Sequence, residues 1–487
     1  MRPLSNLDAS FLHLETPHLP MNIGGTFIFH DPTDNPMTPA RLRRHITRRM
    51  PLAPVFRERL IMPPLGLGTS CWVDDPDFDL SDHLRFRELD GPLTQARLQP
   101  LVQGFFARLL DRDRPLWEAM LVTEKNTPPG SPRRFALILK VHHAACDGLS
   151  AKAIITSLLD GPEPPALPAD HWNPAPTPSR LRTWQRALTT DLPALPRRTL
   201  DLASQAVRSA RASWQLRRQE PGMQPLFYID PPATPFNIPA DAQRLQLHAE
   251  LSLSRLKRIK DTQPGLTVND VVLAVCGGAL HGYLQARQQI PARELVAMAP
   301  VSRRVESRTG ITGNQVSAML VGLATGTSDP LERLRLVQQN AQRAKRFNQQ
   351  VELERLLTGL PSLPTGLYLR AYAACRLANH LWPVFNLVIT NIAGMPMPLN
   401  LDGAPLESTA TFAPIYDGMG LTLVIMSYLD TTNIGITTTA DALEEPERFL
   451  HCLHDALDEL ALATGAEDTR PARRSAKKVV RLEPAAT

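Results

Sequence analysis

The chain has 487 residues and a formal net charge of +5, with 53 Lys and Arg against 48 Asp and Glu. This length exceeds what one hydrophobic core usually supports, and an apolar fraction of 43% is normal for globular proteins, so we expect two folded domains rather than a disordered chain. The five cysteines contain no CxxC pair, which argues against a disulfide framework and a cysteine zinc site. The start lacks a signal-peptide pattern and no apolar run could span a bilayer, which argues against an integral membrane protein.

The first part of the chain mixes helical and strand patterns. Thr38 followed by Pro39 has the residue types of a helix N-cap and first turn. Residues 135–141 form a short, continuously apolar run, which is typical of a buried strand. We predict helices near 39–50, 96–110 and 149–161, and strands at 116–122 and 135–141.

A proline-rich connector and a basic stretch follow. Residues 161–178 contain eight Pro or Gly among eighteen positions, so they can neither propagate a helix nor sit centrally in a sheet. Residues 180–218 carry nine Arg and two Asp, and 199–219 are predicted to form a bridging helix. Such a stretch suits phospholipid headgroups, a phosphorylated cofactor or nucleic acid, although a solvated helix face would look the same.

The second half again alternates between the two element types. We predict strands at 245–251, 295–302, 315–325, 386–392, 421–428 and 433–439, and helices at 252–261, 268–289, 330–349 and 445–462. Mixed elements in both halves imply two α/β domains. The predicted divisions are an N-terminal domain 1–180, a connector 181–235, a C-terminal domain 236–466 and a basic, disordered tail 467–487.

The string HHAACDG, residues 142–148, is the most informative motif in the chain. Adjacent histidines leaving a strand point to opposite faces, so only one of them readily faces a reaction centre. A histidine with a pKa near neutrality suits a general base that takes a proton from a hydroxyl group. Asp147 can organise the loop by bonding backbone N–H groups or pairing with an Arg, and Gly148 permits a sharp turn into the next helix.

Three other interpretations of this motif stay open. His142, His143 and Asp147 could hold a metal ion, but diverging histidines ligate one ion poorly and no further cluster completes a shell, so no metal is predicted. The histidines could instead be a structural pair in the core. Cys146 could be a nucleophile beside His143. No GxSxG, Walker A or GxGxxG motif supports serine hydrolysis, phosphoryl transfer by a P-loop or a Rossmann cofactor.

HHxxxDG resembles the signature of the CoA-dependent acyltransferase superfamily. Further strings in the same order resemble the bacterial wax ester synthase/acyl-CoA:diacylglycerol acyltransferase family, and together they cover roughly residues 4–462. They are LSNLDASFLHLETPHLPMNIGG from Leu4, Arg114-Pro115-Leu116-Trp117-Glu118, Val268-Asn269-Asp270-Val271, Pro300-Val301-Ser302-Arg303-Arg304, Gly313-Asn314 and Thr390-Asn391-Ile392-Ala393-Gly394. Asn22 and Ala393 depart from the family, which commonly has His and Pro there; these departures bear on the preferred acceptor more than on catalysis.

The resemblance implies two chloramphenicol-acetyltransferase-like domains, with mixed sheets flanked by helices and a tunnel between them. It implies His143 as the general base, with His142 and Asp147 supporting it. Asn269 becomes a possible donor to the oxyanion and Asp270 a supporting residue. The implied substrates are acyl-CoA and a long-chain alcohol or diacylglycerol, with direct transfer, no acyl-enzyme and no bound cofactor.

The resemblance also implies a cytoplasmic protein in peripheral contact with the inner face of the membrane or with lipid inclusions. Two alternative functions remain at this stage. One is a condensation-like or polyketide-ester acyltransferase that uses a carrier-bound thioester. The other is a non-catalytic lipid-binding protein. A nucleic-acid partner is not expected, because aromatic residues are scarce and no nucleic-acid motif is present.

Overall fold

The structure is a computed structural model that describes residues 1–32, 35–63, 69–126, 132–146, 148–162, 167–219, 231–241, 243–302, 316–351, 362–377 and 383–466. The predicted basic tail lies outside these ranges, as do positions 303–304 and 313–314 of the family-like strings. Over the described ranges, no helix combines the length and the apolar character that crossing a bilayer requires.

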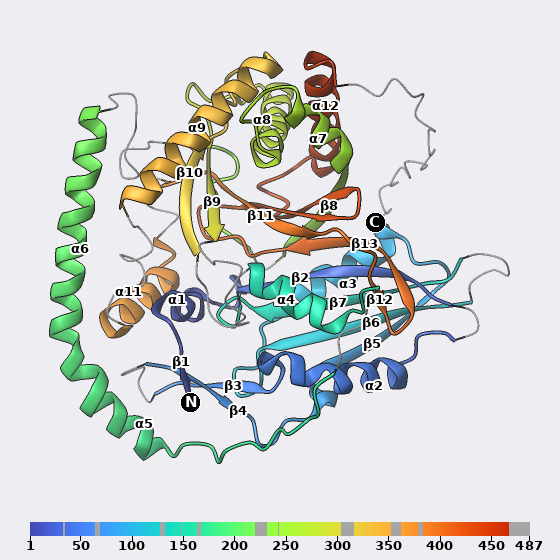
Figure 1. Cartoon of the computed structure of the whole chain (residues 1–487), viewed down its shortest axis with the longest axis vertical. Coiled ribbons are helices and arrows are strands. Elements are labelled where there is room, and N and C mark those ends of the chain that lie inside the picture. The colour runs from blue at the N-terminus through green and yellow to red at the C-terminus, as the bar shows by residue number, and fades with distance from the viewer. Residues whose placement is uncertain are drawn as a thin grey trace, which may run out of the picture.

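Two six-stranded mixed sheets form the centre of the molecule (Figure 1). The first sheet has the order β12-β13-β2-β7-β6-β5, and only its β5 and β6 neighbours run parallel. Its strands are β2 (Asn22–His30), β5 (Leu84–Asp90), β6 (Trp117–Lys125), β7 (Arg134–His142), β12 (Asn400–Leu401) and β13 (Ala404–Phe412). A small antiparallel sheet lies below it, formed by β1 (Arg2–Pro3), β3 (Glu58–Ile61) and β4 (Cys71–Asp74).

Helices cover both faces of the first sheet. Strand β7 alternates between two apolar clusters, with Phe135 and Leu137 on the side of α2 (Pro39–Arg49) and Ala136 and Ile138 on the side of α3 (Gln95–Ala107). This two-sided burial explains why the strand reads as a continuous apolar run. α1 (Asn6–Leu14) precedes β2, and α4 (Gly148–Leu158) follows β7.

The second sheet has the order β10-β9-β11-β14-β15-β8, in which β11 runs parallel to β9 and β14. Four helices pack on one face of it, at the top of Figure 1, and share one hydrophobic core with it. The strands are β8 (Leu245–Ser252), β9 (Val296–Ser302), β10 (Val316–Gly322), β11 (Leu387–Met395), β14 (Leu421–Tyr428) and β15 (Thr431–Thr438), and the helices are α7 (Leu253–Asp261), α8 (Val268–Ala286), α9 (Pro330–Val351) and α12 (Pro446–Ala463).

The predicted helices and strands are confirmed, with boundary shifts of a few residues. Thr38 caps α2 by accepting a hydrogen bond from the backbone N–H of Arg41. Among the elements that the predictions missed are α1, β2, β5, β13, α11 and the strands of the small sheet. Strand β2 carries Gly24 and Gly25 near its start, which interrupts the side-chain pattern from which a strand is recognised. A Cβ on Gly24 would lie 1.9 Å from the Leu139 carbonyl oxygen, so only glycine lets β2 approach β7 this closely.

The second half of the chain supplies two strands to the first sheet. β13 pairs antiparallel with β2, and β12 pairs with β13 at the edge. The range 236–466 predicted for the second domain therefore includes strands that belong to the first sheet. β13 also lies against β15, where a Cβ on Gly435 would come within 1.8 Å of the Thr411 carbonyl oxygen. The two sheets thus meet along β13.

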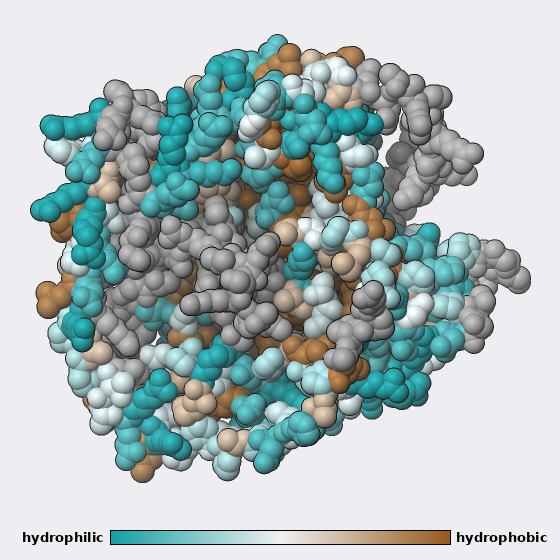
Figure 2. Space-filling model, viewed as in Figure 1, coloured by the Kyte–Doolittle hydropathy of each residue, from teal (hydrophilic) through white to brown (hydrophobic). Residues whose placement is uncertain are grey.

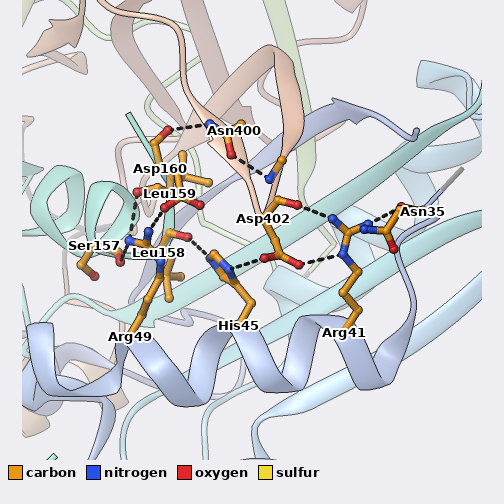
Figure 3. A network of polar contacts seen from close by, with 11 residues as sticks. Asn35, Arg41, His45, Arg49, Ser157, Leu158, Leu159, Asp160, Asn400 and Asp402 are labelled. Atoms are coloured by element: carbon orange, nitrogen blue, oxygen red, sulfur yellow. Dashed lines mark hydrogen bonds and ion pairs between the residues drawn. The ribbon is translucent and has the colours of Figure 1, made fainter. Parts of the chain in front are cut away.

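A buried polar network fastens this β12–β13 hairpin to the first half (Figure 3). Arg41, His45 and Arg49 lie along one side of α2 at a spacing of four residues. Arg41 Nε donates to Asp402 Oδ2 (2.7 Å) at the hairpin turn, and His45 Nε2 lies 2.7 Å from the Leu158 carbonyl oxygen at the end of α4. Further contacts join Arg41 to the carbonyl of Asn35, and Arg49 to Asp160 and the carbonyls of Ser157 and Leu159.

The connector reaches the second half along the outside of the molecule. Residues 167–179 run as extended chain below the first half and lead into α5 (Arg180–Arg186), a π-helical turn (Ala187–Asp191) and α6 (Leu192–Gln219). Helix α6 stands along one edge of the molecule in Figure 1 and packs against α9. A helix is present where the bridging helix was predicted, and it begins seven residues earlier than predicted. α11 (Ser362–Ala374) packs on α1.

Candidate active site

The HHAACDG motif joins the end of β7 to the start of α4. The backbone N–H of His142 donates to the Leu116 carbonyl (3.0 Å), and that of His143 donates to the Met21 carbonyl (2.8 Å). These two bonds hold the turn between the segment before β6 and the segment before β2. Asp147 lies outside the described residues, and Gly148 is the first residue of α4.

The two histidines face different surroundings. The His143 ring lines a cavity and stacks on the Phe11 ring of α1, with centroids 3.9 Å apart and planes 6° from parallel. His142 is completely buried, and its Nδ1 accepts a hydrogen bond from the backbone N–H of Ala144 (3.0 Å). Because Nδ1 acts as an acceptor, the proton of a neutral His142 ring must be on Nε2.

A buried glutamate faces that ring nitrogen. Glu15 Oε1 lies 3.2 Å from His142 Nε2, and Glu15 Oε2 lies 2.8 Å from the guanidinium of Arg112. The backbone N–H of Met21 also donates to Glu15 (3.2 Å). Burial by itself would raise the pKa of Glu15, but the hydrogen bonds and charges of His142 and Arg112 outweigh it and lower that pKa to about 2. Glu15 therefore stays ionised and fixes both His142 and the chain leading to Met21.

The cavity beside His143 has a volume of about 260 Å³ and lies between the two halves of the chain. Nearly all of its lining is apolar. The first half contributes residues from α1, β2 and α4, and the second half contributes residues from β9, β10, β11, β13 and β14. The lining residues are Leu7, Phe11, Ile23, Gly24, His143, Ala151, Lys152, Ile155, Met298, Pro300, Ala318, Val388, Thr390, Ile392, Thr411, Phe412, Ala413, Pro414, Tyr416, Thr422, Val424 and Met426.

Lys152 is the charged side chain among these lining residues. It lies on the first turns of α4, and its Nζ donates to the Gly394 carbonyl of β11 (2.7 Å). Burial lowers the pKa of Lys152. This hydrogen bond ties the helix that follows the histidine motif to the second sheet, across the cavity.

A second buried lysine lies on the other face of β7. Lys140 Nζ donates to the carbonyls of Phe105 and Arg108 at the end of α3 (both 2.9 Å) and lies 3.2 Å from a Glu118 carboxylate oxygen. Burial lowers the pKa of Lys140 to about 8, although the charge of Glu118 acts in the opposite direction. Asn22 donates to the same Arg108 carbonyl (3.1 Å). Both side chains satisfy helix-end carbonyls that would otherwise be buried without a partner.

Asn269 and Asp270 are not among the residues that line the cavity beside His143. Asp270 forms a capping box with Thr267 at the start of α8: the Thr267 N–H and hydroxyl donate to Asp270 Oδ2 (3.0 and 2.6 Å), and the Asp270 N–H donates back to Thr267 Oγ1 (3.2 Å). Asn269 Oδ1 accepts a hydrogen bond from the Asn391 amide (3.0 Å). Thr390 and Ile392 line the cavity, so Asn391 and Asn269 lie on the opposite face of β11.

This geometry bears on two alternatives for the motif, Cys146 as a nucleophile and a metal site. Cys146 is completely buried in the first core and does not line the cavity. Within the described part of the chain, no three His, Cys, Asp or Glu side chains gather as metal ligands would.

Comparison with known proteins identifies the family. Residues 4–272 match the wax ester synthase/diacylglycerol acyltransferase catalytic domain, and residues 312–461 match the C-terminal domain of the same family. The chain belongs to the wax ester synthase/diacylglycerol acyltransferase family. It is therefore an acyl-CoA-dependent O-acyltransferase of the class that produces wax esters and triacylglycerols.

Relatives of this acyltransferase match it over nearly its whole length. The probable diacylglycerol O-acyltransferase tgs2 of Mycobacterium tuberculosis is 30% identical over 94% of this chain and 98% of its own. O-acyltransferase WSD of Acinetobacter baylyi is 28% identical over 94% of this chain and 96% of its own. The structure of a wax ester synthase/diacylglycerol acyltransferase from Marinobacter aquaeolei VT8 superimposes with a TM-score of 0.64 at 27% identity, covering 95% of this chain and 100% of that one.

More distant structures share the fold of this acyltransferase. The starter condensation domain of rhizomide synthetase superimposes with a TM-score of 0.57 at 15% identity, covering 95% of this chain and 94% of that one. The predicted fold class, two acyltransferase-like α/β domains with mixed sheets flanked by helices, is confirmed by these matches and by the two sheets described above.

Sequence reasoning missed three residues that surround the histidine pair of the acyltransferase. Phe11 and Glu15 lie in the string that carried the family resemblance, and the sequence contains no local signal for their contacts with residues 142 and 143, which are more than a hundred positions away. Lys152 follows the motif by four residues at a helical spacing. This spacing, which can be read from the sequence, indicates that Lys152 lies on the same side of α4 as the first residue of the helix.

Proposed function

We propose that this acyltransferase moves a long-chain acyl group from acyl-CoA to a long-chain alcohol or to diacylglycerol, with His143 as the general base. The observation that supports this most is the position of the His143 ring, which faces an apolar cavity of about 260 Å³ lined by both halves of the chain. An imidazole in such surroundings can accept the proton of a hydroxyl group while long alkyl chains occupy the apolar walls.

The proposed reaction is direct transfer between two bound substrates. The imidazole of His143 accepts the hydroxyl proton of the acceptor while the acceptor oxygen attacks the thioester carbonyl carbon. The resulting tetrahedral intermediate collapses, the carbon–sulfur bond breaks and His143 returns its proton to the CoA sulfur. Because a thiolate is a good leaving group, the reaction needs no acyl-enzyme. The apolar lining would limit competing attack by water.

The other residues of the motif are assigned supporting roles in this proposal. His142, held by Glu15, fixes the backbone that carries His143, and Asp147 and Gly148 shape the turn into α4. We expect Asn269 to position β11 by accepting the Asn391 amide through its Oδ1. Donation to the oxyanion would have to come from its Nδ2 and reach the other face of that strand. Asp270 supports the site by starting α8.

The proposed partners are the two substrates and a lipid surface. Acyl-CoA acts as co-substrate and no resident cofactor takes part in the steps above. Alcohols of long chain length and diacylglycerol reside in membranes or lipid inclusions, so we propose peripheral contact of the protein with one of these surfaces, at the cytoplasmic face.

The test is release of CoA thiol from palmitoyl-CoA in the presence of hexadecanol or dioleoylglycerol. His143→Ala should lower kcat by about a hundredfold or more, because it removes the general base. His454→Ala, which removes an exposed histidine of α12, is the matched control and should leave the rate unchanged. Full activity of a folded His143→Ala protein would refute the assignment. Activity of the wild type with carrier-bound thioesters only, or with no donor, would favour the condensation-like or the non-catalytic alternative.

A further inference from the structure

Helix α6 exposes its large apolar side chains to solvent. Leu200, Val207 and Trp214 are spaced by seven residues, so they lie along one side of the helix with a drift of about 20° per step. Their relative exposures are 71%, 51% and 55%, which are high for apolar side chains on a helix that packs against a protein body. In Figure 2, brown apolar residues interrupt the teal surface along the edge where α6 lies.

On the opposite side of α6, three small or polar residues are half-buried. Gln205, Ser209 and Ala212 lie about 120° to 180° around the helix from Leu200 and are half-buried. In an ordinary surface helix the apolar side faces the core and the polar side faces water. By helical spacing Leu195, Leu202 and Leu216 also fall opposite Leu200. The helix therefore has apolar residues on the side of the protein body and a second, exposed apolar stripe, which packing against the rest of the chain does not explain.

Arginines accompany the exposed apolar stripe. Arg197, Arg208, Arg211 and Arg218 are all exposed on the same half of the helix surface as Leu200. Arg218 also stacks over the Trp214 ring, with its guanidinium carbon 3.7 Å from the ring centroid. Over its full length α6 contains six Arg and a single acidic residue, Asp201.

The segment before α6 shows the same feature. Leu181 and Leu188 are again seven residues apart, and their relative exposures are 67% and 54%. Arg182 is exposed next to the first of them. The apolar and basic character therefore continues along the edge of the molecule from α5 to the end of α6.

We propose that the α6 stripe, defined by Leu200, Val207 and Trp214 with their flanking arginines, is a docking surface for an anionic phospholipid bilayer. The helix would lie in the plane of the interface, with the apolar side chains among the acyl chains and the arginines at the headgroup phosphates. This inference assigns a place to the peripheral contact proposed above, but it does not depend on His143 or on catalysis.

Charge decides between a bilayer and other occupants of this stripe. A second copy of the chain would bring its own arginines against those of the first, and these like charges would repel. A nucleic acid would satisfy the arginines but would leave the Leu and Val side chains exposed. An anionic bilayer satisfies both the charged and the apolar groups.

The test is co-sedimentation of the full-length protein with vesicles of phosphatidylcholine alone or of phosphatidylcholine mixed with phosphatidylglycerol. The wild type should bind the mixed vesicles more tightly, and salt should weaken that binding. Combined Leu200→Ser, Val207→Ser and Trp214→Ser substitutions should lower the partition coefficient at least tenfold. Combined Arg208→Gln, Arg211→Gln and Arg218→Gln substitutions should lower it by about a hundredfold and flatten its salt dependence.

Two controls separate this inference from the proposed function. Leu462→Ser removes an equally exposed leucine from α12 and should not change vesicle binding. His143→Ala should bind vesicles as the wild type does, whatever its activity. Three outcomes would overturn the bilayer assignment. Either triple variant could bind vesicles as the wild type does, or the wild type could bind neutral and mixed vesicles equally. The protein could also self-associate in a way that the serine variant abolishes. Circular dichroism and thermal unfolding would show that both triple variants remain folded.

Discussion

At the scale of single residues, the two adjacent histidines of the motif have different surroundings and different roles. His143 faces the cavity, whereas His142 is buried against Glu15 and bonds backbone. Glu15 is linked to both, because it accepts the Met21 N–H and the Met21 carbonyl in turn accepts the His143 N–H. A change in Glu15 should therefore move His143 without touching a substrate.

We expect Glu15→Gln to lower kcat by about tenfold to a hundredfold with little change in KM, since small displacements of a catalytic group are costly. Steady-state kinetics of thiol release would measure this split. Glu407→Gln, which removes a carboxylate paired with Arg134 away from the cavity, is the matched control. An unchanged kcat, or an increase of KM alone, would contradict a positioning role for Glu15.

The same substitution has a consequence for stability as a function of pH. The pKa of Glu15 is lowered from 4.5 to about 2, so its ionised form stabilises the folded state above pH 4.5, and this contribution is lost as pH falls toward 2. This pKa shift contributes about 3 kcal/mol to the free energy of unfolding at neutral pH. Denaturant unfolding from pH 7 to pH 3 should show a stability difference between wild type and Glu15→Gln that shrinks as pH falls. A constant difference would contradict this.

At the scale of elements, α8 and β11 form the wall behind the cavity. The capping box of Thr267 and Asp270 begins α8, and the hydrogen bond between Asn269 and Asn391 joins the helix start to the outer face of β11. Asn269 thus contacts the strand that supplies Thr390 and Ile392 to the cavity, whereas Asp270 acts on the start of α8.

We expect Asp270→Ala to lower the free energy of unfolding by about 1 kcal/mol, because it removes the carboxylate that completes the capping box while Thr267 still caps the helix. Activity at a temperature where the protein is folded should change far less than in His143→Ala. Asn269→Ala should be nearly neutral for stability and show only a moderate loss of kcat. Chemical denaturation and thiol-release assays on the same preparations would measure both quantities. A loss of activity in Asn269→Ala as deep as that of His143→Ala would instead favour the oxyanion role.

At the scale of the whole molecule, the two halves are interlocked. β13 lies in the first sheet although it comes from the second half, and the network of α2 holds its hairpin in place. Four consecutive residues at the end of β13 and just after it, Thr411 to Pro414, line the cavity. The hairpin therefore belongs to both the fold and the site.

We expect the described body to unfold in a single calorimetric transition, and Asp402→Asn to lower that transition without splitting it. The substitution weakens the partner of the buried Arg41 side chain, and because Asp402 is about a third exposed we expect a loss of about 1 to 3 kcal/mol. Asp441→Asn, at an exposed position, is the control and should leave the transition in place. Two separate transitions in the wild type would show that the halves unfold independently.

The sequence by itself determined most elements and the position of the motif. A continuous apolar run predicts β7, helical apolar spacing predicts α4, and the Thr267 cap marks the start of α8. HHAACDG stands between the strand and the helix that these patterns predict. The order of the family-like strings was enough to indicate the family.

Only the tertiary structure decided what surrounds His143. Phe11, Glu15 and Met21 reach it from before β2, and Thr390 and Phe412 reach the same cavity from strands more than two hundred residues further along the chain. Local pattern fixes how a segment folds, because backbone hydrogen bonding and side-chain period are short-range. Which segments then face one another depends on how β13 crosses into the first sheet, and no short-range signal encodes that pairing.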